Sequence, residues 1–426
     1  MKSTLSFCLL LVGYCILCHH VPGHQDYEDG QEELNPPEEH FQAEGNVTGE
    51  NMLCHKIAPS NADFAFRFYR QATSAAEGKN VFFSPLGISA AFAMLVLGAK
   101  SATRNQILEA LTFNLTEIEE KEIHDGFHHL IQLLNSPDRE IQLSMGNAPF
   151  VDVHLNLLQK FVDDVKKFYD SKVFTSNFED PEHLAKAEKQ INDYIKNKTQ
   201  GKITNLVKDL NQDTLLVLVN YIFFKAHWED PFNPDSTREG HFFLDDGTSV
   251  EVKMMNRDGG YKTYHDKQLS CTVVQIPYKG NAFALFVLPD KRKMEEVEDA
   301  LSKKTLFKWK KIYGRVDFFI SVFSVSGTYE LKDFFMKLGV AKVFSNQADL
   351  SGITQDANLK MSRAVHKAML NVYENGTEAA AATFLEIVAD SLSPTIEFNR
   401  PFLMMIVDQA TNSILFMGKI MNPTEK

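Results

Sequence analysis

Several segments of the sequence are apolar at nearly every position, and they limit the fold more than any other feature. The runs are TLLVLVNYIFF at 214–224, CTVVQIPY at 271–278, NAFALFVLP at 281–289, VDFFISVFSVS at 316–326 and FLMMIVDQ at 402–409. Runs of this kind, which lack a regular polar face, are typical of β-strands that are covered on both faces. They therefore predict a large layered domain.

Helical patterns alternate with these runs. Residues 61–74 have the apolar spacing of an amphipathic helix, and residues 88–100 are apolar almost all round, which predicts a deeply buried helix. The chain has 426 residues, enough for two or three average domains, but neither a linker nor a repeat follows residue 61. A hydrophobic fraction of 44% with 33 phenylalanines supplies a large core. We expect one mixed α/β (α+β) domain over residues 57–426.

The N-terminal segment has the layout of a secretory signal peptide. Lys2 precedes an apolar run at 5–17 that is too short to span a bilayer, and the sequence then turns polar. We expect residues 1–18 to form the signal peptide, with cleavage between Cys18 and Gly23. The protein is therefore expected to be secreted and extracellular.

An acidic tail is expected to follow over residues 19–56. Between residues 24 and 52 there are nine acidic residues and no lysine or arginine, a composition typical of disorder. Tyr27 lies among these acids and is a candidate for sulfation and binding to a basic partner. A tail that only solubilises the protein is the simpler interpretation.

Sequons and cysteines agree with secretion. Asn-x-Ser/Thr sequons occur at Asn46, Asn114, Asn197 and Asn375, which predicts a glycoprotein. Once the signal peptide is removed, Cys54 and Cys271 remain. The sequence leaves open whether these two are bonded to each other, free, or bonded to another molecule.

A search for enzyme motifs finds no G-x-S-x-G, G-x-x-x-x-G-K-[ST], H-E-x-x-H or G-x-G-x-x-G. His124 and His128 lie four residues apart on an expected helix, but no third ligand accompanies them. A solvated helix face therefore explains them better than a metal site. His366 stands among apolar neighbours, as a hydrogen-bonded core histidine does. We expect no catalysis, no metal and no cofactor.

Five segments together resemble the signature segments of serpins. They are residues 80–95 (NVFFSPLGISAAFAML), 218–232 (LVNYIFFKAHWEDPF), 348–354 (ADLSGIT), 362–383 (SRAVHKAMLNVYENGTEAAAAT) and 398–424 (FNRPFLMMIVDQATNSILFMGKIMNPT). The resemblance is collinear from about Asn61 to the C-terminus. More narrowly, the five segments resemble those of the secreted group, clade A, that includes alpha-1-antitrypsin and thyroxine-binding globulin.

The resemblance implies a serpin fold with three β-sheets, about nine helices and an exposed reactive-centre loop at about 374–397. It implies a plasma serine protease inhibitor rather than an enzyme. A target protease cuts the loop and becomes a covalent acyl-enzyme. It is trapped when the loop inserts as a new strand into the largest sheet. A monomer without nucleic-acid or membrane partners is expected, and the net charge of −12 agrees with the absence of nucleic acid.

The same resemblance assigns the residues of the mechanism. The scissile bond is Asp390–Ser391, and the loop hinge consists of Glu374, Gly376, Thr377, Glu378, Ala379, Ala380, Ala381 and Ala382. Ser84, Asn220 and His366 match the polar network beneath the region where the sheet opens. Trp228 matches a tryptophan near the top of the opening. Gly87 stands where alpha-1-antitrypsin has a serine, so we expect a thinner network.

The loop itself alternates as a strand does. With Asp390 placed before the scissile bond, one face carries Thr377, Ala379, Ala381, Thr383, Leu385, Ile387 and Ala389, and none of these is charged. The other face carries Glu378, Ala380, Ala382, Phe384, Glu386, Val388 and Asp390. This period of two is typical of a strand, whereas the resemblance implies that the segment is an exposed loop before cleavage and inserts as a strand afterwards. Gly376 gives backbone freedom at the hinge.

The target and the exact bond stay open at this stage. An aspartate before the scissile bond requires a protease with a cationic pocket, and IVAD at 387–390 resembles the preference of granzyme-B-like proteases. If the bond is displaced, Ala389 suits an elastase and Leu392 suits a chymotrypsin-like protease. Heparin activation is not expected, because residues 117–130 are acidic.

The alternative function is that of a non-inhibitory serpin that carries a hydrophobic hormone. Asn281 matches a ligand-site asparagine of the thyroxine carrier, but Gln409 and Asn412 replace its arginines. A glycan on Asn375, one residue before the hinge glycine, would obstruct insertion and weaken the inhibitory interpretation.

Overall fold

The structure is a computed structural model, and it describes residues 52–136, 139–309, 312–356, 359–377 and 393–425. The predicted signal peptide, Tyr27, Asn46 and the loop segment 378–392 lie outside the described residues. All described residues belong to one compact unit, Thr48–Lys426. Within them, no helix is both long enough and apolar enough to cross a membrane.

Nine α-helices occur among the described residues, as the resemblance implies. They are α1 (Leu53–Ala75), α2 (Pro85–Val96), α3 (Ser101–Ala110), α4 (Glu120–Leu134), α5 (Gln159–Tyr169), α6 (Pro181–Lys198), α7 (Met294–Ala300), α8 (Lys303–Lys308) and α9 (Leu331–Lys337). Two short 3₁₀ helices are η1 (Pro234–Ser236) and η2 (Lys342–Phe344).

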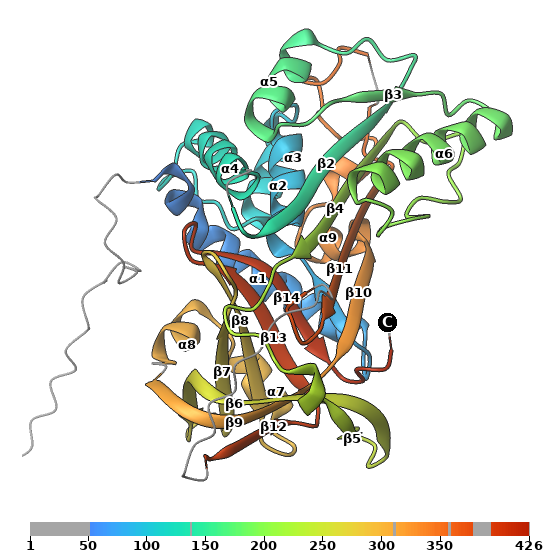
Figure 1. Cartoon of the computed structure of the whole chain (residues 1–426). Coiled ribbons are helices and arrows are strands. Elements are labelled where there is room, and N and C mark those ends of the chain that lie inside the picture. The colour runs from blue at the N-terminus through green and yellow to red at the C-terminus, as the bar shows by residue number, and fades with distance from the viewer. Residues whose placement is uncertain (1–51, 137–138, 310–311, 357–358, 378–392, 426) are drawn as a thin grey trace, which may run out of the picture. The chain divides into compact units, whose positions relative to one another are not determined.

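The strands divide between two hydrogen-bonded sheets. They are β1 (Val81–Phe83), β2 (Gln142–Asp152), β3 (Phe174–Ser176), β4 (Leu216–Lys225), β5 (Arg238–Phe243), β6 (Ser249–Asp266), β7 (Cys271–Pro277), β8 (Ala282–Pro289), β9 (Ile312–Ser321), β10 (Phe323–Glu330), β11 (Arg363–Val372), β12 (Thr395–Phe398), β13 (Phe402–Asp408) and β14 (Ser413–Ile420). One sheet has five strands in the order β10-β11-β4-β2-β3 (Figure 1). The other has the order β1-β14-β13-β8-β7-β6-β9-β12, with β5 paired to β6.

The third sheet implied by the resemblance is continuous with the second. Strand β6 is 18 residues long. Its first part pairs with β5 up to Met254, and its last part pairs with β7 from Lys262 onward. Because one unbroken strand belongs to both groups, hydrogen bonding joins them into a single sheet.

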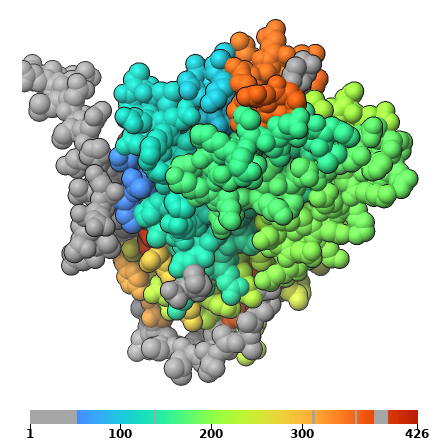
Figure 2. Space-filling model, turned by 90° about the horizontal axis from the view of Figure 1, so that it is seen from above, coloured from blue at the N-terminus to red at the C-terminus, as the bar shows by residue number. Residues whose placement is uncertain are grey.

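The position of β4 explains why residues 214–224 are apolar throughout. Nine of its ten residues are buried, and alternate side chains enter two different cores. Leu218 and Ile222 point to the main core, whereas Val217 and Val219 point to a smaller core beneath α6. The central strand is therefore covered on both faces, as predicted. The segment that includes α5 and α6, coloured green, forms much of the face seen in Figure 2.

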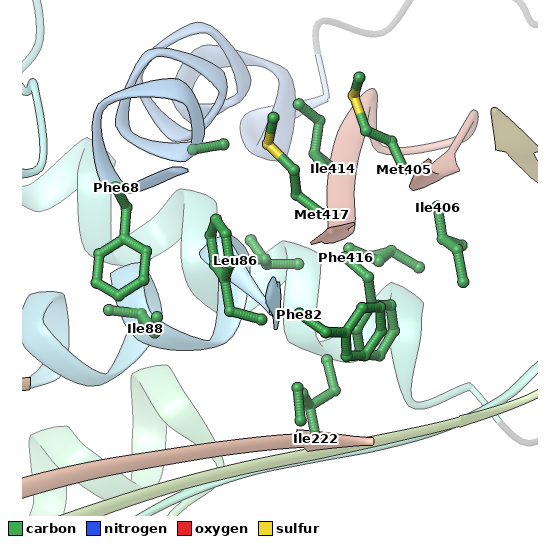
Figure 3. Packing of buried hydrophobic residues seen from close by; sticks show 14 of the residues in the cluster. Phe68, Phe82, Leu86, Ile88, Ile222, Met405, Ile406, Ile414, Phe416 and Met417 are labelled. Atoms are coloured by element: carbon green, nitrogen blue, oxygen red, sulfur yellow. The ribbon is translucent and has the colours of Figure 1, made fainter. Parts of the chain in front are cut away.

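Helix α2 lies in the main core against this sheet. All twelve of its residues are buried, as the sequence predicts. Its start is fixed by Pro85 in the first turn and by the Ser84 side chain, which accepts a hydrogen bond from Gly87 N. Next to it, Phe82 and Phe416 stack with ring centroids 5.3 Å apart, close to Ile222 of β4 (Figure 3).

Three sequence-based expectations need correction. Helix α1 begins at Leu53, a few residues before the expected domain start at 57, because Cys54 is already fully buried. The run 316–326 is not one strand: it is divided at Val322 between β9 and β10, which belong to different sheets. His124 does not lie on a solvated face. It is 4% exposed, and its Nδ1 is hydrogen-bonded to the hydroxyl of Tyr169 on α5 at 2.7 Å.

Candidate functional site

The candidate site is the seam between β4 and β11, defined as the pairing of residues 217–223 with residues 363–369. These strands run parallel over seven pairs, from Val217–Arg363 to Phe223–Met369 (Figure 1). Strands β2 and β10 flank them in antiparallel pairing. Beyond the seventh pair, β4 continues to Lys225 and β11 continues to Val372 without pairing to each other. The seam is therefore closed at one end and open at the other.

A tight turn stands at the open end. Tyr373 and Gly376 exchange two backbone hydrogen bonds: Tyr373 N donates to Gly376 O at 2.7 Å, and Gly376 N donates to Tyr373 O at 3.1 Å. Gly376 has a φ of +140°, and a Cβ at this position would lie 2.1 Å from Ala226 O. Only glycine fits so close to another backbone. The turn brings the chain back toward the extension of β4.

Thr377 is docked into that extension. Its backbone N donates to Ala226 O at 2.8 Å, while its hydroxyl accepts from Ala226 N at 2.6 Å and donates to Ala226 O at 3.1 Å. Gly376 forms an antiparallel bridge with His227. Thr377 has no exposed surface. The first residue of the predicted uncharged face therefore already lies beside β4's extension.

Trp228 holds the turn from the other side. Its backbone N donates to Asn375 O at 2.9 Å, and its indole Nε1 donates to Tyr373 O at 2.9 Å. The indole stacks on Tyr278 with a centroid distance of 4.2 Å. The Glu374 carboxylate accepts a hydrogen bond from the Thr237 hydroxyl at 2.8 Å. Residues 373–375 of the turn are therefore held by hydrogen bonds from Trp228 and Thr237.

A buried polar network crosses the seam lower down. His366 and Asn220 are paired across it, and the His366 Nε2 accepts a hydrogen bond from Ser84 N at 3.0 Å. Because Nε2 accepts, Nδ1 carries the proton and donates to Asn220 Oδ1. The Asn220 amide in turn donates to Asn147 Oδ1 at 2.7 Å. The expected core histidine therefore connects β11 to β4, β2 and the start of α2.

The environment keeps the imidazole of His366 neutral. The side chain has no exposed surface, and desolvation by burial lowers its pKa to about 3. The ring of Tyr329 lies over it, with centroids 6.1 Å apart. Protonation of Nε2 would also point a second N–H at the Ser84 N–H. The network can exist only with a neutral histidine.

Gly87 makes room for this network because it has no side chain. A Cβ at this position would lie 2.7 Å from Asn220 Oδ1. The Asn220 amide therefore occupies the space that any side chain at position 87 would need. The network is arranged around the glycine, and Asn147 on β2 provides a further hydrogen-bond partner.

The remaining predicted residues are distributed as follows. Asn114 and Asn197 are exposed, whereas Asn375 is 7% exposed. Cys54 and Cys271 are both free and buried. Glu378, the four alanines at 379–382, Asp390 and Ser391 lie outside the described residues. Within the described part of the chain, no group of three or more histidine, cysteine or acidic side chains could hold a metal.

Comparison with known proteins gives the family. A family model described as "Serpin (serine protease inhibitor)" matches residues 59–423. The chain belongs to the serpin family. It is 47% identical to alpha-1-antiproteinase 2 of Equus caballus over 431 residues, covering all of both chains. It is 45% identical to alpha-1-antitrypsin of Sus scrofa over 425 residues, covering 98% of each.

Solved structures of similar proteins superpose on this serpin. Human thyroxine-binding globulin in complex with its hormone superposes with a TM-score of 0.84 at 45% identity, covering 88% of this chain and all of that one. Human glycosylated kallistatin superposes with a TM-score of 0.82 at 44% identity, with 88% and 100% coverage.

Some residues that support this serpin's seam and the turn at its open end were not predicted from the sequence. Asn147, Tyr373 and Thr237 supply partners to Asn220, Trp228 and Glu374. For Asn147 a signal existed, since it is a polar residue within a run that forms β2. Its role depends on the register that places it opposite Asn220. Tyr373 acts through its backbone, so its side-chain type carries no signal.

Proposed function

We propose that this serpin is a secreted inhibitor that traps a serine protease by loop insertion at the seam. The protease cleaves the reactive loop, stays attached as an acyl-enzyme, and is carried along as the loop enters between β4 and β11. One observation carries the proposal: Gly376 and Thr377 already pair with His227 and Ala226 at the open end. Continuation of that pairing leads the next residues into the seam.

The energetics support such a movement. Insertion replaces seven parallel pairs with two antiparallel ladders, one on each side of the new strand. Antiparallel pairing is slightly more stable per residue than parallel pairing. Each additional hydrogen bond contributes about 0.5–1.5 kcal/mol, and burial of Leu385 and Ile387 adds roughly 1.5–3 kcal/mol each. Over about a dozen residues the total reaches about ten kcal/mol, which makes insertion irreversible.

The order of residues in the loop supports the same direction of movement. The uncharged face begins with Thr377, which is fully buried at the mouth of the seam. A charge at this position would have to be buried without a partner, at a cost of several kcal/mol. The small alanines at 379–382 would follow between packed strands with little resistance. Fast insertion matters, because the acyl-enzyme otherwise hydrolyses and releases an active protease.

The proposed scissile bond is Asp390–Ser391, and the proposed target is an aspartate-specific, granzyme-B-like serine protease. The carboxylate of Asp390 would pair with a cationic pocket, most naturally an arginine. A cut after Ala389 by an elastase, or after Leu392 by a chymotrypsin-like protease, is the alternative.

The test is a panel of serine proteases that includes an aspartate-specific one. Denaturing gels show a complex of summed mass, and mass spectrometry locates the cut. We expect a complex with the aspartate-specific protease and cleavage after Asp390. Asp390→Arg should transfer complex formation to a trypsin-like protease. Cleavage of the loop by every protease without any complex, and without a gain in heat resistance, would refute trapping.

Thr377→Arg is the matched variant for insertion. It leaves the proposed scissile bond unchanged but places a charge at a buried position. We expect cleavage at the same bond at a similar rate, while the covalent complex is largely lost. If Thr377→Arg traps the protease as well as the wild-type protein does, the seam is not the site of insertion.

Carriage of a hydrophobic hormone is the second candidate, and the similarity to thyroxine-binding globulin favours it. The backbone of Gln409 donates to Asn281 O at 2.7 Å, so the residue that matches the carrier's asparagine lies beside one that replaces an arginine. A glutamine at this position cannot form the ion pair with a carboxylate or phenolate ligand that an arginine would form. Incubation with labelled thyroxine and steroids tests this function, and saturable binding would establish it.

Secretion forms part of the proposal. The mature domain would follow a cleaved signal peptide and an acidic tail. The exposure of Asn114 and Asn197 supports glycosylation at these two sequons. Mass spectrometry of the protein from culture medium gives both the new N-terminus and the glycan sites.

A further inference from the structure

Strand β2 has an open edge along most of its length. On one side β4 pairs with residues 142–151, whereas on the other side β3 pairs only with residues 150–152 (Figure 1). Within the described residues, no strand therefore lies beside the outer edge of residues 142–149. Strand edges are normally short, covered or charged, because their free backbone groups can pair with another chain. This edge is therefore a candidate interaction site.

Alternation along β2 identifies the backbone groups that face outward. Asp152 N donates to Leu215 O, next to β4, while Val153 N donates to β3, both at 2.9 Å. Each residue of a strand points its N–H and its C=O to the same side, and successive residues point to opposite sides. The pairing of β2 with β4 has no register shift, so the N–H and C=O of Leu143 and Met145 face outward.

The next odd-numbered positions close the edge. The Asn147 carbonyl accepts a hydrogen bond from the hydroxyl of Ser171, and Pro149 has no N–H to donate. Pairing with β3 begins immediately afterwards. No turn, loop or side-chain hydrogen bond of the described residues reaches the outward groups before that point. Five groups remain for a partner: the N–H and C=O of Leu143, the N–H and C=O of Met145, and the N–H of Asn147.

A groove runs along this edge. It consists of two hollows of about 320 and 230 Å³ that share Asn135, Leu143, Ser144 and Lys198 in their linings. The walls come from the C-terminal ends of α4, α5 and α6. The Ser144 hydroxyl donates to Lys198 O at 2.9 Å, which fixes the end of α6 against β2. The edge is therefore recessed between helix ends.

The recess and its charge indicate the kind of partner. An extended peptide can enter between the helix ends, whereas the same edge of a second copy is equally recessed and cannot approach. Lys198 is exposed and has no ion pair within the described part of the chain; its ammonium lies 6.0 Å from the Tyr194 ring centroid. Arg139 at one end of the groove is already paired with Asp408, and Asp170 lies at the other end. A carboxylate on the peptide would therefore find its partner in Lys198.

We propose that the outer edge of residues 143–147 binds an extended acidic segment of another protein as an added β-strand. The five outward groups hold the backbone of the segment, which gives affinity for any extended chain. Lys198 selects a glutamate or aspartate side chain on it. Strands β2 and β4 separate this edge from the seam, so the inference does not depend on the inhibitory function proposed above.

The probe is an amidated heptapeptide of alternating valine and glutamate, with fluorescein at its N-terminus. Full-length protein is titrated into it, and fluorescence anisotropy measures binding. The protein is first treated with a glycosidase, because the predicted acceptor Asn197 adjoins Lys198. Hydrogen–deuterium exchange locates the peptide. We expect saturable binding and a roughly tenfold or greater slowing of amide exchange within residues 142–148.

Methylated peptides test the backbone pairing. Two versions carry N-methyl groups on alternate backbone amides, one on each edge of the peptide, and both keep every charge. Only one edge of an added strand faces β2, so one version should lose binding and the other should retain it.

Charge variants test the selectivity. Lys198→Glu should weaken binding of the glutamate peptide by roughly tenfold and strengthen binding of the corresponding lysine peptide. Lys196→Glu makes the same change of charge on an exposed residue of α6 that lines neither hollow. It is the matched control and should leave both affinities close to those of wild type.

Three results would overturn the inference. The first is the absence of saturable binding up to about 1 mM peptide. The second is equal binding of the two methylated peptides, which would mean attraction to surface charge without strand pairing. The third is slower exchange in residues 217–223 and 363–369 instead of 142–148, which would place the peptide in the seam. None of these readouts changes if the protein fails to trap a protease.

Discussion

Replacement of His366 by glutamine should remove a defined part of the pH dependence of stability. Burial lowers the pKa of His366 to about 3 in the folded protein, from an ordinary value of 6.5. Above pH 6.5 both the folded and the unfolded states hold a neutral imidazole, and the stability is fully present. As the pH falls from 6.5 toward 3, only the unfolded chain takes up the proton, and the free energy of unfolding decreases.

The size of the effect follows from the shift. One pKa unit corresponds to about 1.4 kcal/mol, so His366 alone lowers the free energy of unfolding by about 2 kcal/mol between pH 6.5 and 5. Glutamine can accept from Ser84 N and donate to Asn220 Oδ1, but it does not titrate. We expect His366→Gln to lower the free energy of unfolding by about 1–2 kcal/mol at pH 8, because its hydrogen bonds have poorer geometry. On acidification, the free energy of unfolding of the variant should fall by about 2 kcal/mol less than that of the wild type.

Urea unfolding, followed by tryptophan fluorescence at pH 8, 6.5 and 5, measures the difference. All other titrating groups are common to the two proteins, so the difference in pH slope belongs to position 366. His241 is exposed on β5, and His241→Gln is the matched control that should keep the wild-type slope. Equal slopes for wild type and His366→Gln would show that the imidazole is not held neutral by burial.

Three further outcomes are expected. Gly87→Ala places a Cβ 2.7 Å from Asn220 Oδ1 and should lower the free energy of unfolding by about 1–3 kcal/mol; unchanged urea unfolding would contradict this. Burial raises the pKa of Cys54 to about 11 and of Cys271 to about 12, so a thiol reagent at pH 8 should label neither in the folded protein and both after unfolding. Trp228→Phe removes the indole donor to Tyr373 O but keeps the backbone bond to Asn375 O, and it should increase proteolysis at the hinge, which timed digestion of the native protein measures; a digestion rate equal to that of wild type would show that the indole bond does not hold the turn.

The fold was largely predictable, because its central strands are apolar on both faces. The β-branched and apolar residues of 214–224 favoured a strand between two layers, and β4 has that position. The division of 316–326 into two strands could not be read locally, since no glycine or proline marks it. It is fixed by a distant partner: Val322 N donates to Lys253 O of β6 at 2.8 Å as the chain passes from one sheet to the other.

The residues of the site could be predicted from the sequence, but the hydrogen bonds between them could not. A histidine and an asparagine within apolar strands are conspicuous, and resemblance to serpins added Ser84. Which atoms meet depends on the register between strands that are far apart in the sequence, such as Asn147 opposite Asn220. The prediction of a solvated face for His124 was wrong for the same reason, because its partner Tyr169 lies on another helix, 45 residues away.

The register at the open end also predicts what the network does on insertion. If the pairing of Gly376 with His227 continues without a bulge, seven residues further along each strand bring Thr383 opposite Asn220. The new strand would separate Asn220 from His366 by two strand spacings, about 10 Å, so their hydrogen bond must break.

The Thr383 hydroxyl would then lie between them and could accept from His366 Nδ1 and donate to Asn220 Oδ1. Thr383→Val leaves both groups unpaired at a cost of about 1–3 kcal/mol each, so we expect insertion to slow by roughly tenfold or more and more protease to escape per complex formed. Thr383→Ser keeps the hydroxyl and should trap the protease as wild type does. The ratio of cleaved to complexed inhibitor, read from gels, distinguishes the two, and an equal ratio for valine and serine would mean that the polar network takes no part in receiving the loop.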